Sequence, residues 1–389
     1  MIKVLKNGTV YSPDYLGKKD ILLVDKRIAA IGDDIHFEES AHVEILDVAG
    51  KLIVPGFIDN HVHIMGGGGE GSYRTRTPEL VLSDAITGGI TTLVGVIGTD
   101  GTTRTMASLV AKAKALKEEG ISCYVHTGSY QVPVKTLTGM IEDDLILIEE
   151  IIGVGEIAIA DHRSSQPNYE EVAKIAAAAR VGGMLSGKAG IVNMHLGDSG
   201  SKLSILDEVI EKTDIPIRQF LPTHINRNRE LFEAGIAHAK KGGYVDFTTS
   251  SIAKFIEQGE TKCSVGLKEM LDNGVPIGQI TFSSDGQASL PEFDEDGEFI
   301  GLQLGRVTSL YKEVREAIVE QGVEPANAFK VITENPAKIL RLSSKGTIDV
   351  GKDADLVLLD ESTFEIESVM ALGRKMLWNK KLLEKGTFE

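Results

Sequence analysis

The chain has 389 residues, of which 41 are basic and 57 are acidic, so its formal net charge is −16. This acidic surplus disfavours nucleic acid and anionic membranes as partners, because both need a basic protein face. We expect no transmembrane helix, since no apolar run reaches the roughly 18 residues that a span requires. The chain begins without a signal-peptide pattern and contains only two cysteines. We therefore expect a cytoplasmic protein that acts on a small molecule.

Both ends of the chain are rich in short strands separated by turns. Strands are predicted over residues 2–5, 20–24, 28–31 and 43–47, and then over 354–359, 366–371 and 374–377. We predict that residues 1–52 and 345–389 together form one small β-sandwich domain.

The middle of the chain, residues 53–344, alternates between strands and helices. Strands are predicted over 54–58, 91–96, 122–127, 156–161, 191–196, 219–223, 244–248 and 279–284. Helices are predicted over 78–87 (with Thr77 as N-cap), 106–119, 169–181, 203–212, 229–241, 267–273, 302–321 and 325–333. Eight alternating strands favour a (β/α)8 TIM barrel. A doubly wound open sheet is the alternative, but it would spread out candidate site residues that belong to five different strands.

A His-x-His motif, His61-Val62-His63, follows the apolar run 52–58. On an extended strand, residues i and i+2 project from the same face, so both imidazoles can hold one metal ion. The motif alone is also compatible with a pair of core or surface histidines. Its meaning depends on what stands at the ends of the other strands.

Further metal-ligand side chains lie on or just after other predicted strands. They are Glu156 on the fourth strand, His195 on the fifth, His224 after the sixth and Asp285 after the eighth. In a (β/α)8 barrel the active site lies at the carboxyl ends of the strands, where these groups would meet. Imidazole and carboxylate suit Zn²⁺ and related ions. We therefore predict a two-metal cage, although each member alone could be an ordinary buried or turn residue.

Longer segments resemble the amidohydrolase superfamily. They are residues 55–63, with the sequence PGFIDNHVH, residues 335–340, with the sequence NPAKIL, and residues 346–357. Within that superfamily the chain is similar to the isoaspartyl (β-aspartyl) dipeptidases. This likeness is carried by residues 66–70, 75–79, 98–100, 127–130, 161–164, 221–228 and 284–286.

The resemblance implies a zinc metallopeptidase that hydrolyses the isopeptide bond of β-aspartyl dipeptides. A hydroxide bridging two divalent metal ions, Zn²⁺ first among them, would attack the side-chain amide. The metal ligands would be His61, His63, Glu156, His195, His224 and Asp285. Asp285 would also be the general base, and Tyr130 would donate to the scissile carbonyl oxygen. The family likeness further implies a homo-oligomer, with octamers as its known form.

The same resemblance assigns the substrate-binding groups. Glu70 would bind the α-ammonium, and Arg163 and Arg227 would bind the two carboxylates. Gly68, Thr99, Tyr130 and Ser289 would complete the substrate site. The chemistry is consistent, because a β-aspartyl dipeptide has one ammonium and two carboxylates, and arginine suits bidentate binding of a carboxylate.

One position departs from the family pattern. The best-known members have a CO₂-carboxylated lysine on strand four, whereas this chain has Glu156. We expect its carboxylate to bridge both metals; a single-metal enzyme with Glu156 outside the ligand shell is the alternative.

Three rival functions stay open: a cyclic-amide hydrolase of dihydropyrimidinase or dihydroorotase type, an N-acyl amino acid deacylase, and a metal-free scaffold. Glu70 favours a substrate with a free ammonium, which the enzymatic rivals would lack.

Overall fold

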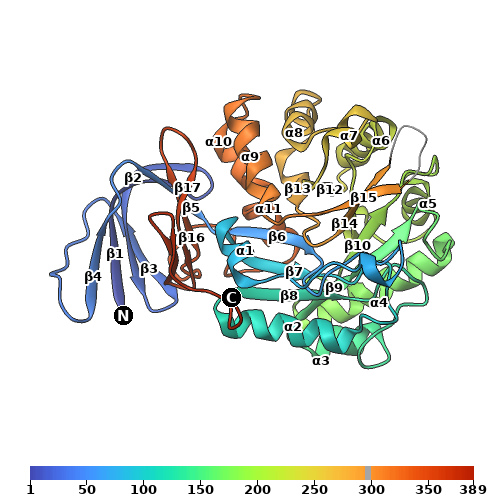
Figure 1. Ribbon diagram of the computed structural model, residues 1–389, viewed down its shortest axis with the longest axis horizontal. Helices are drawn as coiled ribbons and strands as arrows, with labels where there is room; N and C mark the ends of the chain where they lie inside the picture. Colours follow the sequence, from blue (N-terminus) through green and yellow to red (C-terminus); the bar gives the residue numbers. More distant parts are fainter. Residues whose placement is uncertain (294–298) are drawn as a thin grey trace.

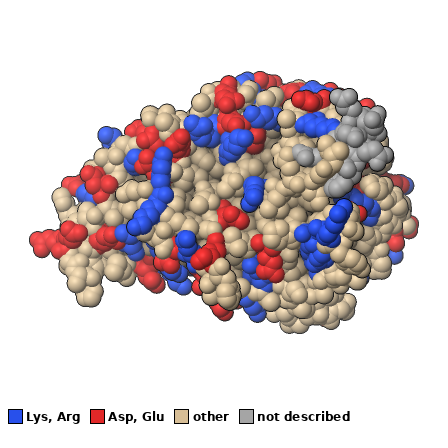
Figure 2. Space-filling view, viewed as in Figure 1, with Lys and Arg blue, Asp and Glu red and all other residues tan. Residues whose placement is uncertain are grey.

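The computed structural model describes residues 1–293 and 299–389. A β-rich part built from both chain ends lies beside a curled parallel sheet that is surrounded by helices (Figure 1). The expected (β/α)8 barrel, with a β-rich domain from both termini, is confirmed. On the face shown in Figure 2, acidic and basic side chains are interspersed over the described surface, as in an ordinary solvated face.

The β-rich part is one nine-stranded sheet in which β1 pairs with three other strands. Its strands are β1 (Ile2–Tyr11), β2 (Tyr15–Val24), β3 (Arg27–Gly32), β4 (Val43–Asp47), β5 (Lys51–Pro55), β16 (Leu356–Asp360), β17 (Ile366–Ala371), β18 (Arg374–Trp378) and β19 (Lys381–Leu382). Strands β5 and β16 pair antiparallel and so join the two chain ends. The sheet has an apolar core of its own, which includes Leu5, Ile21, Ile53 and Met370. The domain boundaries at residues 52–53 and 344–345 stay a prediction.

Eight parallel strands form the barrel. They are β6 (Phe57–Val62), β7 (Ile90–Gly95), β8 (Ser122–Thr127), β9 (Ile151–Ile159), β10 (Ile191–Leu196), β11 (Phe220–Thr223), β12 (Val245–Thr248) and β13 (Ile280–Ser283). Strands β6 to β11 pair in chain order, and β12 pairs with β13. The first and last strands meet at a bridge between Val62 and Gly286. This contact brings the His-x-His motif beside the end of strand eight.

The buried carboxylate of Asp246 on β12 links these two groups of strands. It accepts hydrogen bonds from Asn60 Nδ2 on β6 at 3.1 Å and from Thr223 Oγ1 on β11 at 2.6 Å. Thr281 and Ser283 on β13 each donate to it at 2.5 Å. Burial raises the pKa of Asp246, and the four donors oppose that rise. One side chain thus spans both places where the barrel ladder is interrupted.

Eleven α-helices occur in the described part of the chain. They are α1 (Leu82–Thr87), α2 (Met106–Glu119), α3 (Ile141–Leu147), α4 (Tyr169–Ser186), α5 (Ser204–Lys212), α6 (Arg229–Lys240), α7 (Ala253–Glu257), α8 (Cys263–Asp272), α9 (Ser309–Val319), α10 (Pro325–Lys330) and α11 (Glu334–Ile339). Side-chain N-caps begin several of them, including a capping box from Asn168 and Glu171 on α4. Within 1–293 and 299–389, no helix has the length and apolarity needed to cross a membrane.

Two of the predicted helices begin later in the structure than expected. The first helix begins at Leu82, because the Thr77 hydroxyl does not cap it but accepts from Gly67 N at 2.6 Å. The helix expected over 302–321 is shorter, because Phe299–Leu304 forms strand β15, which pairs with β14 (Ser289–Phe293). Helix α9 then starts at Ser309.

The apolar run 52–58 is divided between β5 and β6 at Gly56. The Gly56 N–H donates to Asp355 O at 2.8 Å, which holds the crossing against the β-rich domain. A Cβ at Gly56 would collide with the Thr91 hydroxyl, so this close approach requires glycine.

Candidate active site

The carboxyl ends of the barrel strands bring all the predicted metal ligands together. The residues are His61 on β6, His63 one residue beyond it, Glu156 on β9, His195 on β10, His224 after β11 and Asp285 after β13. All are buried except Asp285, which is partly exposed. The strand ends therefore meet as the barrel geometry predicts.

The Glu156 carboxylate lies at the centre of this cluster. Its Oε2 lies 3.3 Å from His61 Nε2, 3.0 Å from His195 Nδ1 and 3.8 Å from His224 Nε2. Its Oε1 lies 3.6 Å from His63 Nε2. The two oxygens thus face different histidines, which is the arrangement that a bridging carboxylate needs.

Two overlapping sets of ligand atoms can each hold a cation. One set is His61, His63 and Asp285; the other is His61, Glu156 and His224, and within each set the atoms lie within 4.8 Å of one another. His63 Nε2 lies 3.1 Å from Asp285 Oδ1. Among the residues that the structure describes, His61 Nε2, Glu156 Oε1 and Asp285 Oδ1 are buried and have no hydrogen-bond partner. Buried imidazole nitrogens and carboxylate oxygens that lack hydrogen bonds are suitable ligands for divalent metal ions.

Outer partners fix which ring nitrogen faces the cluster. His61 Nδ1 lies 3.0 Å from Asn193 Oδ1 and donates to it, so that Nε2 faces the cluster. His195 Nε2 lies 3.0 Å from Asp161 Oδ2, which leaves Nδ1 facing Glu156. Carboxylate and amide partners of this kind orient metal-binding histidines and raise their basicity.

His224 is held by both its side chain and its backbone. Its Nδ1 contacts the hydroxyl of Thr248, and its Nε2 faces the cluster 2.9 Å from His195 Nδ1. His224 and Asp285 both adopt positive φ, at 66° and 54°. Such conformations are rare outside glycine and persist where the surrounding structure imposes them, often at functional sites.

The carboxylates dominate the electrostatics of the cluster. Burial opposes the charged form of His61, but Glu156 and Asp285 outweigh burial and raise its pKa to about 9. Burial and the neighbouring His195 lower the pKa of His224 to about 3. His61 thus partly supplies the positive charge that the carboxylates demand, and a divalent cation would supply it more completely.

Tyr130 lies beside the cluster with its hydroxyl 2.9 Å from His195 Nδ1. Its ring lies under the guanidinium of Arg163, 5.4 Å from the ring centroid. Burial and the charge of Glu156 raise the pKa of Tyr130 well above its usual value. The phenol therefore keeps its proton and can donate it in a hydrogen bond.

Two of the predicted substrate-binding charges also lie at this mouth. Glu70 Oε1 accepts from Thr99 Oγ1 at 2.8 Å and lies 3.5 Å from Arg163 Nη1. Arg163 also grips Asp161 through Nε at 3.0 Å and Nη2 at 2.7 Å. One edge of the Arg163 guanidinium is thus already hydrogen-bonded to Asp161.

The remaining predicted groups are placed around the same opening. Gly68 lies so close to Ser289 that a Cβ on Gly68 would come within 3.1 Å of it. Arg227 is half-buried in the loop after β11, and its charge lowers the pKa of His224. His162, whose role the sequence leaves ambiguous, has a side chain 87% exposed beside Asp161.

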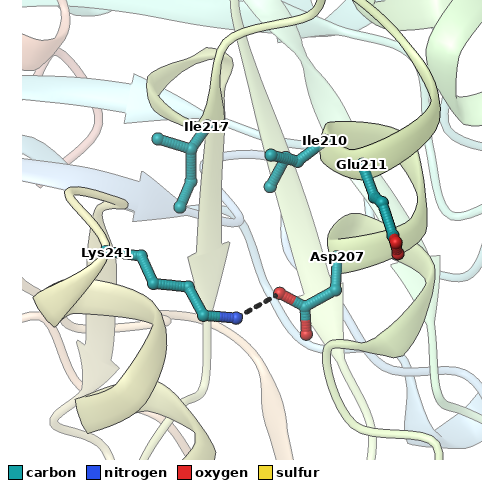
Figure 3. Close-up of a pocket in the computed structure, with 5 residues that line it drawn as sticks. All are labelled: Asp207, Ile210, Glu211, Ile217 and Lys241. Carbon is teal, nitrogen blue, oxygen red and sulfur yellow. Dashed lines mark hydrogen bonds and ion pairs between the residues drawn. The ribbon is translucent and has the colours of Figure 1, made fainter.

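A separate depression of about 320 Å³ lies between α5 and α6 (Figure 3). Lys241 points across it to Asp207 at 3.1 Å. Ile217 lines it from the short 3₁₀ helix η2 (Ile217–Gln219), which precedes β11. The depression therefore lies at the amino ends of the strands, away from the ligand cluster.

The chain belongs to the amidohydrolase family, whose sequence profile matches residues 52–376. The predicted superfamily is thus confirmed, and with it the class of hydrolytic enzyme. The chain is 47% identical to the β-aspartyl dipeptidase of Fervidobacterium islandicum AW-1, solved in complex with β-Asp-Leu; the match covers 98% of both chains, with a TM-score of 0.90. The resemblance to β-aspartyl dipeptidases drawn from short segments thus extends over the whole fold.

More distant relatives have the names of other enzymes. The allantoinase of Bacillus licheniformis is 26% identical over 94% of this chain and 88% of its own. The dihydroorotase of Pelotomaculum thermopropionicum is 25% identical over 93% of this chain and 90% of its own. A D-hydantoinase structure at 18% identity, with a TM-score of 0.71, shares the fold.

Proposed function

We propose that this chain is a metal-dependent dipeptidase that hydrolyses the side-chain amide bond of β-aspartyl dipeptides. The observation that carries the proposal is the placement of Glu70 and Arg163 within 3.5 Å of each other at the mouth of the metal-ligand cluster. An anion and a forked cation side by side match the α-ammonium and α-carboxylate of the aspartyl unit. The similarity to the Fervidobacterium enzyme over the full chain supports the same substrate.

We further propose that the cluster binds two divalent ions, with Zn²⁺ the first choice for its imidazole and carboxylate donors. His61, His63 and Asp285 would hold one ion and His195 and His224 the other, with Glu156 shared between them. Bound metal of this kind polarises a carbonyl and activates water at neutral pH.

The protein's own groups carry the proton transfers and the charge stabilisation. Asp285 takes a proton from the attacking water and returns it to the leaving amine. The protonated Tyr130 donates to the carbonyl oxygen as negative charge develops there, which is usually a large electrostatic contribution. Tyr130 is held for this task by burial and by the stacked guanidinium of Arg163.

Substrate binding follows from the remaining charges. Glu70 receives the α-ammonium and Arg163 the α-carboxylate, while Arg227 receives the carboxylate of the leaving residue. Gly68, Thr99 and Ser289 line the same opening and fix the backbone of the aspartyl unit. Because each charge has an opposite charge on the substrate, uncharged or cyclic amides would leave these charged groups without a partner.

A cyclic-amide hydrolase is the second candidate, because the allantoinase and the dihydroorotase match nearly the whole chain. The test compares hydrolysis of β-Asp-Leu, α-Asp-Leu and dihydroorotate, each with Zn²⁺ and then with a chelator. We expect metal-dependent cleavage of β-Asp-Leu alone. Turnover of dihydroorotate instead would overturn the substrate assignment, and chelator-resistant cleavage would overturn the metal assignment.

We also propose that the chain is a cytoplasmic homo-oligomer, as the family resemblance implies. Large apolar side chains are exposed on two adjacent helices: Leu147 on α3 (69% exposed), and Met184 (62%) and Leu185 (72%) on α4. Large apolar side chains exposed on adjacent helices are a feature of protein interfaces. Sedimentation of the wild type and of Leu185→Asp tests this, and a monomeric wild type would refute it.

A further inference from the structure

Arg104, which no prediction from the sequence singled out, lies buried beside the substrate-binding loop. It belongs to the loop between β7 and α2, and only 5% of its side chain is exposed. Its Nη2 donates to Gly67 O at 2.6 Å and its Nη1 to Gly68 O at 3.2 Å. One guanidinium thus holds two consecutive carbonyls of the glycine run 66–69.

Burying this cation is unfavourable unless its charge is compensated. Burial lowers the pKa of Arg104, and its nearest carboxylate oxygen, on Asp100, is 3.5 Å from Nη1. Its Nε is buried without a partner in the described part of the chain. The two hydrogen bonds to the glycine run and the ion pair with Asp100 together offset the cost of burying this charge.

The glycine run cannot be held by side chains of its own. A Cβ on Gly67 would come within 3.2 Å of the His63 ring. Gly68 has a φ of 64°, and a Cβ there would lie 2.6 Å from Thr75 O. The backbone therefore passes directly over a metal-ligand histidine, and its position must be fixed from outside, by groups such as Arg104.

Glu70 directly follows this run and is held by the same loop that carries Arg104. Thr99 Oγ1 donates to the Glu70 carboxylate at 2.8 Å, five residues before Arg104. The β7–α2 loop thus contacts the substrate-binding segment at two points, one at the carboxylate and one at the backbone.

We propose that Arg104 is a positioning residue that sets selectivity for substrates with a free α-ammonium. It fixes the carbonyls of Gly67 and Gly68, which lie just before Glu70 in the chain. It thereby holds the Glu70 carboxylate in the position that binds the substrate ammonium. The inference rests on the proposed function, because it assumes that Glu70 binds the substrate amine.

The test compares two ligands that differ only in the amine. One is β-Asp-Leu, measured by its KM; the other is N-succinyl-leucine, which lacks the α-ammonium, measured by its inhibition constant. In Arg104→Met we expect the KM to rise about tenfold or more, since two hydrogen bonds from a charged donor are lost. The inhibition constant of N-succinyl-leucine should change less than about threefold, because no ammonium is involved.

A double-mutant cycle with Glu70→Gln distinguishes positioning from general damage. Once Glu70 is replaced, Arg104→Met should have little further effect on the KM. Arg104→Lys keeps a positive charge and hydrogen-bond donors. Its KM for β-Asp-Leu should therefore rise less than that of Arg104→Met. Arg180→Met, which removes an arginine bonded to Gln219 just before β11, at the opposite end of that strand, serves as the control and should leave both constants unchanged.

Equal losses for both ligands, or an undiminished effect in the Glu70→Gln background, would overturn the role of Arg104. Those results would leave the proposed function intact, because wild-type cleavage of β-Asp-Leu is measured in the same series. A wild type that does not cleave β-Asp-Leu would instead refute the proposed function itself. If Arg104→Met does not fold, Arg104→Lys with the same two ligands decides the question.

Discussion

The carboxylate of Asp161 lies between His195 and Arg163 and contacts both. Its Oδ2 is 3.0 Å from His195 Nε2 and 2.7 Å from Arg163 Nη2. These two contacts hold the pKa of Asp161 well below its usual value against the effect of burial. One side chain therefore connects a histidine that we assign to metal binding with a cation that we assign to substrate binding.

Asp161→Asn should weaken both functions at once. We expect metal affinity to fall about 10- to 100-fold, because the outer partner of His195 loses its charge. The KM for β-Asp-Leu should also rise, since Arg163 loses its bidentate anchor. Chelator competition on the metal-free protein gives the first quantity and steady-state kinetics the second. Asp198→Asn, an exposed change after β10, should alter neither.

Tyr130→Phe should lower kcat by about 10²-fold, the loss typical for one donor to a developing oxyanion. The KM should change little, because the ring and its stacking with Arg163 remain. Steady-state kinetics on β-Asp-Leu measures both constants. A change confined to the KM would make Tyr130 a binding residue and not a stabiliser of the transition state.

Glu156→Gln should lower the bound metal from two ions per chain towards one. The amide offers one oxygen instead of two, so it cannot be shared between two ions. Metal analysis of the replete protein after gel filtration measures the stoichiometry. Added bicarbonate should not activate the wild type; activation would point to a carboxylated lysine instead of Glu156.

Lys345→Met should destabilise the junction between the barrel and the β-rich domain. The buried Lys345 Nζ lies 2.5 Å from Asp355 and 2.8 Å from Asp353, which together raise its pKa in spite of burial. Removing the cation leaves two carboxylates close together, a loss of about 3–5 kcal/mol. Thermal unfolding measures it, with the exposed Lys338→Met, paired with Glu334, as a near-neutral control.

His238 on α6 should make stability depend on pH. Burial lowers its folded pKa from 6.5 to about 4, and neither ring nitrogen has a partner among the described residues. The unfolded state then binds the proton first, so stability is complete above about pH 6.5 and falls by up to about 3 kcal/mol as the pH drops to about 4. As the pH falls from about 6.5 to about 4, the melting temperature of His238→Leu should fall less than that of the wild type. Parallel acid curves for the two proteins would contradict this.

The barrel was predictable because its strands are apolar runs separated by helices with clear caps and glycine ends. The family assignment from residues 55–63 was also confirmed. The predicted element boundaries were wrong where a tertiary contact outweighed the secondary-structure preference of the local sequence. Thr77 has a side chain suited to an N-cap, yet its hydroxyl accepts a hydrogen bond from Gly67 N instead. Residues 302–304 fall inside a predicted helix, yet they belong to strand β15, which pairs with β14.

The candidate ligands could be named from the sequence because they lie on or just after predicted barrel strands. Asn193 and Thr248 could not, because a polar residue on a strand gives no local sign that it will face a histidine from another strand. Arg104 was missed for the same reason, since its partners are backbone carbonyls that any residue would offer. The roles of the individual site residues stay predictions.

The carboxylate of Asp246 also bears on how the molecule is made. Its donors come from the first strand, at Asn60, and from the last, at Thr281 and Ser283. During synthesis, His61 and His63 leave the ribosome more than two hundred residues before Asp285. The cluster can therefore assemble only after strand eight has been synthesised. A nascent or truncated chain that ends before strand eight lacks both this closure and Asp285. On the proposed assignment, the complete set of metal ligands therefore forms only after the barrel has closed.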